Sequence, residues 1–262
     1  MGCIEKNGVA LYFEEMGEGL PLIFLHGLGG DINQPKGILT DLKDVRLIML
    51  DQRAHGKSRF MQDAPMSFDD MADDVIELAD LLKLNKFALG GISMGAGVAA
   101  NTAYRYRDRI DKLILVRPAW GEGAMEAESR EWYKELAFYL ERQDRVAYEH
   151  SKTFHAICEK APEAKASFLN AFENEASLTY YKKFEMIPSQ CPYEKIENLK
   201  KIKADTIVLS NQHDRIHKYL YGILYMKYLQ HGIFHEIVSK TVCEQSYKAD
   251  IHAYISYYMH ES

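Results

Sequence analysis

The chain has 262 residues, of which 47% are hydrophobic and 27% charged, and its formal net charge at pH 7 is -6. This length and composition exclude a fibrous or disordered chain and predict one or two globular domains with a sizeable core. The acidic balance offers no basic surface for a phosphate backbone, so nucleic acid is not an expected partner.

The sequence contains no signal for membrane insertion or export. No apolar run reaches the roughly 18 residues that a spanning helix needs, and the first ten residues lack a basic stretch that leads into an apolar one. The four cysteines, Cys3, Cys158, Cys191 and Cys243, are scattered without a C-x-x-C pair. We therefore expect a cytoplasmic protein that has no membrane partner and no disulfide framework.

The first predicted elements are two strands, at residues 9–15 and 21–25. Gly17 and Gly19 lie between them, and glycines between two strand-like runs favour a tight turn. We expect an antiparallel hairpin that leads into a larger sheet.

Several later apolar runs are continuous rather than alternating, which is typical of parallel strands covered on both faces. The clearest runs are residues 22–25, 47–50, 87–92, 113–116 and 207–209. Helical stretches lie between them, for example residues 67–82, where Ser67 and Asp70 match a capping box. A last strand is predicted at 234–239 and a last helix at 246–259. This alternation predicts an α/β fold with a mostly parallel sheet.

The alternation stops after Val116. Residues 118–204 contain no strand-like run, and we expect about four helices there, one beginning at Pro162 in the favoured first helical position. The chain thus divides into a first core part (1–117), a helical insertion (118–204) and a second core part (205–262). The insertion is rich in aromatic residues, which we expect mainly in its own core, with some lining an apolar pocket. They include Trp120, Trp132, Tyr133, Phe138, Tyr139, Phe168, Phe172, Tyr180, Tyr181 and Phe184.

Residues 91–95, Gly-Ile-Ser-Met-Gly, form a Gly-x-Ser-x-Gly sequence between a predicted strand and a helix predicted at 96–106. Ser93 is expected on a sharp, strained turn, where the two glycines remove side chains that would collide. Its hydroxyl would project above the carboxyl edge of the sheet at a helix N-terminus, where negative charge is favoured. This placement predicts a nucleophilic serine.

With this turn, the sequence resembles the α/β-hydrolase superfamily over essentially its whole length, in particular capped serine hydrolases of the esterase and haloperoxidase-like branch. Three further segments carry the resemblance: residues 25–30 (LHGLGG) resemble the family's His-Gly oxyanion loop, residues 51–58 the turn after the next strand, and residues 210–214 the loop with the catalytic acid. One departure is Ala54, where the family usually has Gly. The resemblance implies a helical cap inserted after the sixth strand of the sheet.

Acyl transfer needs a nucleophile, a base and two donors for the oxygen that becomes negatively charged. The resemblance implies that the backbone N–H groups of Leu28 and Met94 form this oxyanion hole and that Asp214 orients the base. It also implies structural roles beneath the loop for His26 and His55.

The histidine that the family places just after the last strand is missing, since residues 240–247 contain none. Without a nearby base, a serine hydroxyl stays protonated and is a poor nucleophile. His217, three residues after Asp214 on the same loop, is one candidate base. His252, in the predicted last helix, is an alternative. The third possibility is that no histidine serves and that Cys243 or Tyr247 occupies the vacant position.

These observations support two hypotheses of different classes. The first is a serine hydrolase that forms an acyl-enzyme at Ser93 with a small or medium-sized, uncharged or apolar ester, or a related acyl or carbon–carbon substrate. The second is a catalytically impaired relative that binds an apolar small molecule beneath the cap. No cofactor is implied, and no metal, because His213, Asp214 and His217 form too thin a cluster for a metal site. The aromatic insertion leaves room for a homodimer.

Overall fold

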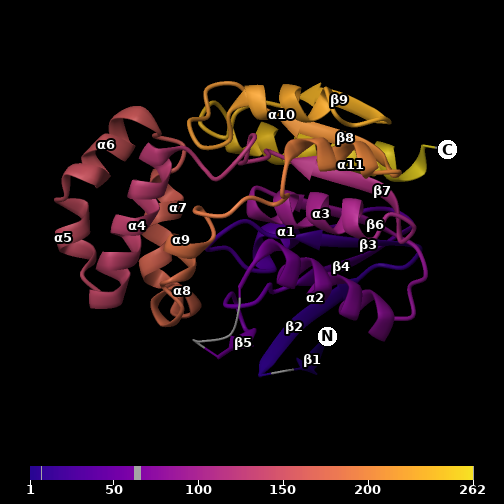
Figure 1. Cartoon of the computed structure of the whole chain (residues 1–262), viewed down its shortest axis with the longest axis horizontal. Coiled ribbons are helices and arrows are strands. Elements are labelled where there is room, and N and C mark those ends of the chain that lie inside the picture. The colour runs from indigo at the N-terminus through magenta and orange to yellow at the C-terminus, as the bar shows by residue number, and fades with distance from the viewer. Residues whose placement is uncertain (7, 62–65, 262) are drawn as a thin grey trace.

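A nine-stranded sheet forms the centre of the computed structural model, which describes residues 1–6, 8–61 and 66–261. The strand order is β1-β2-β4-β3-β6-β7-β8-β9, and β5 pairs with β2 (Figure 1). The strands are β1 (Gly2–Lys6), β2 (Val9–Met16), β3 (Leu20–Leu25), β4 (Val45–Leu50), β5 (Arg59–Phe60), β6 (Phe87–Ile92), β7 (Ile110–Val116), β8 (Asp205–Ser210) and β9 (Gly232–Glu236). The five continuous apolar runs lie in β3, β4, β6, β7 and β8, which pair in parallel. The predicted α/β fold with a mostly parallel sheet is confirmed.

The prediction of a hairpin between the first two strands is wrong, because β4 lies between β2 and β3. β2 pairs antiparallel with β4, whereas β3 pairs in parallel with β4 and β6. The glycines do form a tight turn, since Gly17 and Gly19 have φ angles of +74° and +119°. That turn passes against the start of β4: a Cβ added to Gly17 would lie 2.4 Å from the carbonyl oxygen of Val45. A turn signal alone does not specify which strand is the neighbour.

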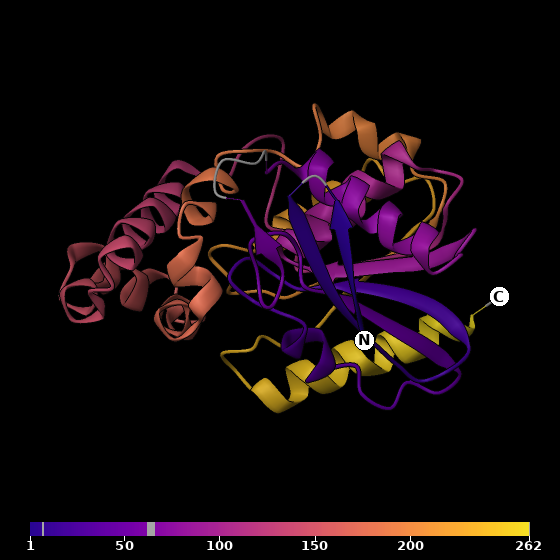
Figure 2. The ribbon, with the colours of Figure 1, turned by 90° about the horizontal axis from the view of Figure 1, so that it is seen from below.

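Helices cover both faces of the sheet. On one face lie α2 (Phe68–Leu81), α3 (Met94–Arg105) and α10 (Tyr219–Met226), and on the other α1 (Asn33–Lys36) and α11 (Glu244–His260) (Figure 2). Each face has its own buried apolar cluster, with Leu89 and Val98 in the first and Phe24 and Ile251 in the second. The sheet is packed on both faces and therefore forms a rigid scaffold that positions the loops at its carboxyl edge.

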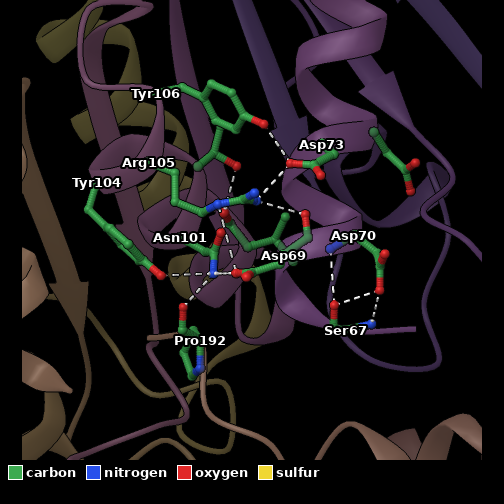
Figure 3. Close-up of polar contacts among 12 residues, drawn as sticks. Ser67, Asp69, Asp70, Asp73, Asn101, Tyr104, Arg105, Tyr106 and Pro192 are labelled. Atoms are coloured by element: carbon green, nitrogen blue, oxygen red, sulfur yellow. Dashed lines mark hydrogen bonds and ion pairs between the residues drawn. The ribbon is translucent and has the colours of Figure 1, made fainter. Parts of the chain in front are cut away.

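α2 begins with the predicted capping box. Ser67 Oγ accepts the N–H of Asp70 at 3.1 Å, and Asp70 Oδ2 accepts the N–H of Ser67 at 2.9 Å. Figure 3 shows the polar contacts that join α2 to α3. Asn101 Nδ2 donates to Asp69 Oδ1 on α2 and to the carbonyl oxygen of Pro192, each at 2.7 Å. These contacts fix α3 between α2 and the C-terminal part of the insertion.

Residues 118–204, all of which the structure describes, contain helices but no strand. The helices between residues 127 and 186 lie together beside the sheet (Figure 1), whereas the short helix at 196–201 contacts α3. We name the whole segment 118–204 the cap. Its elements are α4 (Ala127–Arg142), α5 (Arg145–Glu149), α6 (Lys152–Lys160), α7 (Lys165–Asn170), η1 (Ala171–Glu173), α8 (Glu175–Thr179), α9 (Lys183–Met186) and η2 (Ile196–Lys201). The expected number of about four helices is too low, because caps at Asp144 and Ser151 start new helices within a few residues. The helix predicted to begin at Pro162 begins at Lys165, after a turn.

The last strand and the last helix differ from the prediction in their bounds. β9 begins at Gly232 and ends at Glu236, because its ladder with β8 stops where Ser210 pairs with Glu236. α11 begins at Glu244, two residues early, because Cys243 Sγ caps it by accepting the N–H of Ser246 at 3.4 Å. In the described part of the chain, no helix combines the length and the apolar composition that crossing a bilayer requires.

Candidate active site

Ser93 lies on the turn between β6 and α3. Its φ and ψ of 58° and -113° are a conformation that costs a residue with a side chain on the order of 1–3 kcal/mol. The turn is held in place because the N–H of Ser93 donates to the carbonyl oxygen of Val116, the last residue of β7, at 3.0 Å. The residue is half-buried and lines a cavity. Its hydroxyl is therefore accessible while its backbone is fixed.

Gly91 and Gly95 are required for this turn because their neighbours leave no room for a side chain. A Cβ at Gly91 would lie 2.4 Å from the carbonyl oxygen of Gly95, and a Cβ at Gly95 would lie 2.5 Å from that of Leu25. Real Cβ atoms essentially never come so close to an oxygen. The Gly-x-Ser-x-Gly sequence thus reflects the close approach of α3 to β6 and β3.

The loop after β3 lies against the serine turn. A Cβ added to Gly27 would be 3.4 Å from the Cβ of Ser93, and Leu28 lines the same cavity as Ser93. Gln34 Oε1 accepts the N–H of Gly27 at 2.7 Å, which holds the loop. Met94, the other expected donor, is the first residue of α3. The structure brings Leu28 and Met94 close to Ser93, and their role as an oxyanion hole stays a prediction.

His26 and His55 are fully buried beneath this loop and hydrogen-bond its backbone. His26 Nε2 accepts the N–H of Gln52 at 3.1 Å, so its Nδ1 donates to the carbonyl oxygen of Gly27 at 2.8 Å. His55 Nε2 accepts the N–H of Gly29 at 3.1 Å. Burial lowers the pKa of His26 to about 4 and the pKa of His55 well below its usual value. These contacts fit the structural roles that the resemblance implied.

Asp214 and His217 reach Ser93 from the loop after β8. His217 Nε2 lies 2.8 Å from Ser93 Oγ, and His217 Nδ1 lies 3.0 and 3.1 Å from the two carboxylate oxygens of Asp214. When the ring proton is on Nδ1 and faces the carboxylate, Nε2 is left to accept the serine proton. The three side chains therefore form a hydrogen-bonded chain in which the imidazole is placed to accept the serine proton.

The surroundings keep Asp214 ionised and His217 neutral. Burial alone would raise the pKa of Asp214, but His217, Arg117 and hydrogen bonds from the loop hold it well below its usual value. Burial, together with the charge of Arg117, lowers the pKa of His217 below its usual 6.5 despite the adjacent carboxylate. At neutral pH the imidazole is thus in the form that accepts a proton.

Arg117 is a site residue that the sequence analysis missed. Its Nε donates to Asp214 Oδ2 at 3.1 Å, its Nη2 donates to the same oxygen, and its Nη1 donates to the hydroxyl of Tyr247 at 3.3 Å. Only 10% of the arginine side chain is exposed. A signal was available: an arginine that directly follows a buried strand needs a buried partner, because arginine is almost never buried unpaired.

The other candidate bases lie elsewhere. His252 is on α11, where its Nε2 lies 3.0 Å from the carbonyl oxygen of Thr40, and it is not among the described residues that line the cavity. The geometry therefore does not support His252 as the base, since its ring is directed to another loop. Cys243 is exposed at the start of α11. Tyr247 does line the cavity, where its hydroxyl contacts Arg117.

A cavity of about 270 Å³ opens above Ser93 between the sheet and the cap. Tyr133 and Phe168 of the cap line this cavity, and their rings stack with the centroids 4.9 Å apart. By contrast, Trp120 and Trp132 are buried in the core. The lining combines apolar residues with charged ones, and includes Leu28, Ile38, Ile92, Ile216, Glu163, Lys240, Glu244 and Lys248.

The fold recurs in known proteins. A family model described as alpha/beta hydrolase fold matches residues 21–229, which is well over half of the chain. The crystal structure of the enol-lactonase from Burkholderia xenovorans LB400 covers 98% of this chain and 100% of its own, with a TM-score of 0.77 and 20% sequence identity. At this identity the likeness shows the fold alone.

Curated relatives match over a shorter stretch. The AB hydrolase superfamily protein YisY of Bacillus subtilis is 34% identical over 120 residues, which is 44% of this chain and 43% of that protein. The non-heme chloroperoxidase CPO-A1 of Kitasatospora aureofaciens is 34% identical over 117 residues, which is 44% of this chain and 42% of that protein. The chain therefore matches less than half of the length of each relative.

Proposed function

Because the chain belongs to the α/β hydrolase fold family, we propose that it is a serine hydrolase that cleaves an ester, or a related acyl or carbon–carbon substrate, through Ser93. One observation carries the proposal: His217 Nε2 lies 2.8 Å from Ser93 Oγ, with Asp214 on the other side of the imidazole ring. A serine hydroxyl becomes an effective nucleophile when a neutral imidazole accepts its proton.

In the first half-reaction, His217 takes the proton of Ser93 while the serine oxygen attacks the carbonyl carbon of the ester. The carbonyl oxygen becomes negatively charged and is stabilised by the N–H groups of Leu28 and Met94. As the intermediate collapses, His217 gives the proton to the leaving alkoxide oxygen, and an acyl group remains on Ser93. A water molecule then attacks the acyl group and its proton passes through His217 to the serine oxygen, which releases a carboxylic acid. Asp214 stays ionised throughout.

The cavity favours a small, uncharged acyl group. Its volume is about 270 Å³, just below the range of about 300–1,000 Å³ that is usual for ligand pockets. Tyr133, Phe168 and Ile216 offer apolar surface beside the serine, which favours an apolar acyl chain over a charged one. The cationic side chains of the lining, Arg117, Lys240 and Lys248, are matched in number by the carboxylates of Asp214, Glu163 and Glu244. The lining therefore has little net charge to attract an ionic substrate.

A fluorophosphonate probe tests the proposal directly, because it labels only an activated serine. We expect stoichiometric labelling of the wild type and none of Ser93→Ala. The rate of labelling of His217→Ala should fall by about a thousandfold or more. His252→Ala is the matched control, because it removes a histidine outside the cavity, and it should label like the wild type.

Two outcomes count against the proposal. If the wild type is not labelled between about pH 6 and pH 9 and does not turn over p-nitrophenyl esters of several chain lengths, the hydrolase proposal is rejected. If His217→Ala labels as fast as the wild type, His217 is not the base. The alternative of a binding protein without turnover was motivated by the lack of a histidine at 240–247, and the contact between His217 and Ser93 removes that motive.

A further inference from the structure

Arg117 connects the strand next to the serine with the loop that carries the acid and the base. Its neighbour Val116 accepts the N–H of Ser93 at 3.0 Å, and its own N–H donates to the carbonyl oxygen of Leu209 in β8 at 2.7 Å. The guanidinium group then reaches Asp214, which lies beyond the end of β8. Two consecutive residues, Val116 and Arg117, are thus bonded to the two sides of the site.

His217 Nδ1 lies close to both oxygens of Asp214, but their other partners differ. Oδ1 accepts the backbone N–H groups of Ile216 and His217 at 3.1 and 2.8 Å, so the loop itself holds this oxygen. Oδ2 accepts from Nε and Nη2 of Arg117. Because the loop bonds only one oxygen in this way, the arginine is what fixes the plane of the carboxylate that faces His217 Nδ1.

The guanidinium group of Arg117 also disfavours protonation of His217. Arg117 Nη2 lies 3.0 Å from His217 Nδ1. Because Nδ1 carries the ring proton that faces Asp214, this contact brings two donors together and is not a hydrogen bond. A second proton, on Nε2, would place two cations in contact inside a mostly buried site, where their repulsion is poorly screened. Asp214 is the group facing the ring with the opposite charge, and Glu163, on the cap side of the cavity, is a more distant second.

We propose that Arg117 is a positioning residue for the proposed reaction: it orients Asp214 through Oδ2 and keeps the imidazole of His217 neutral, so that Nε2 accepts the proton of Ser93. The inference rests on the proposed function, since it concerns the base of that reaction. It predicts an effect of Arg117 on the pH dependence of serine reactivity, which a merely structural arginine would not have.

The test measures the rate of fluorophosphonate inactivation against pH for the wild type, Arg117→Gln and Arg117→Lys. Arg117→Gln removes the cation and keeps one donor for Asp214. The pKa of His217 should then rise, so the acid limb of the profile should move to higher pH by about one unit. Arg117→Lys keeps the charge but has no planar fork to hold the carboxylate. The acid limb of the pH profile of Arg117→Lys should stay near that of the wild type, whereas its inactivation rate on the plateau should fall by about tenfold.

Arg105→Gln is the matched control. Arg105 Nη1 donates to Asp73 Oδ1 at 2.7 Å, which is also an arginine–aspartate pair between two elements, at the far end of α3 (Figure 3). This variant should keep the wild-type limb and plateau. If the acid limb of the pH profile of Arg117→Gln coincides with that of the wild type, the proposal is overturned. If Arg117→Gln does not fold, a plateau rate of Arg117→Lys equal to that of the wild type overturns it. Failure of the proposed function is distinct, because the wild type itself would then not react.

Discussion

The buried lysine between the cap and the sheet should make stability depend on pH. Lys183 of α9 is 1% exposed, and its Nζ donates to the carbonyl oxygens of Ala54 and Ala176 at 2.7 and 3.2 Å. Burial lowers the pKa of Lys183 from its usual 10.5 to about 7. The perturbation is Lys183→Met, which keeps the length of the side chain and removes the titrating group.

The magnitude follows from the two pKa values. The unfolded chain keeps the Lys183 proton up to about pH 10.5, whereas the folded protein releases it near pH 7. Unfolding therefore takes up a proton between these pH values, and the stability of the wild type rises with pH across that window. The slope is about 1.4 kcal/mol per pH unit, or about 2 kcal/mol between pH 7.5 and 9.

Urea unfolding at several pH values between about 7.5 and 9 measures this effect. The charge of Lys183 also lowers the pKa of His26 and His55, but burial keeps both histidines neutral in this pH range. The difference in unfolding free energy between Lys183→Met and the wild type therefore isolates Lys183. From the lower to the upper pH, the unfolding free energy of Lys183→Met should fall by about 2 kcal/mol relative to that of the wild type, because only the wild type gains stability from Lys183. Lys182→Met, at the exposed neighbouring position, should run parallel to the wild type. A constant difference for Lys183→Met would refute the reasoning.

Three further predictions concern the serine turn, the start of α2 and the first turn of α11. Ser93→Gly should be more stable than Ser93→Ala by about 1 kcal/mol, the reverse of the usual order, because only glycine relieves the strain at φ 58°; urea unfolding of both variants decides this. Ser67→Ala should lower the free energy of unfolding by about 1 kcal/mol through loss of the α2 cap, whereas an unchanged midpoint in urea would contradict that value. Tyr247→His should not accelerate fluorophosphonate labelling, because Ser93 already has His217 at 2.8 Å and Arg117 loses a contact; a tenfold gain would contradict the role of His217.

The strands and the serine turn are predictable from the sequence because each is encoded in a few consecutive residues. A continuous apolar run such as residues 22–25 is stable only as a covered strand, and Gly91 and Gly95 mark the place where α3 touches the sheet. The pairing of β2 with β4 is different, since it joins Phe13 to Leu50 across a long stretch of chain. Nothing local distinguishes β4 from β3 as the neighbour of β2.

The candidate site also contains residues that local motifs predict and residues that only the tertiary structure identifies. Ser93 and Asp214 follow from motifs, but the choice between His217 and His252 depends on where a ring points. The N–H groups of Ile216 and His217 both bond to Asp214 Oδ1, which turns the loop back on itself and brings the ring against the carboxylate. The sequence does not reveal this orientation because it depends on a tertiary contact: the carboxylate is held by an arginine nearly a hundred residues earlier in the chain.

Acid and base on one loop simplify the assembly of the site. Asp214 and His217 are three residues apart, so one turn brings them together, and Arg117 fixes the plane of the carboxylate. The distance of the ring from Ser93 depends on the rest of the fold. Consecutive peptide groups at the end of β7 set that distance, since the carbonyl of Val116 bonds the serine turn and the N–H of Arg117 bonds β8. Three parallel strands in fixed register therefore hold the nucleophile and the base at 2.8 Å. The loop before α11 is then not needed to supply a base, so Lys240 of that loop and Tyr247 of the first turn of α11 are available to line the cavity.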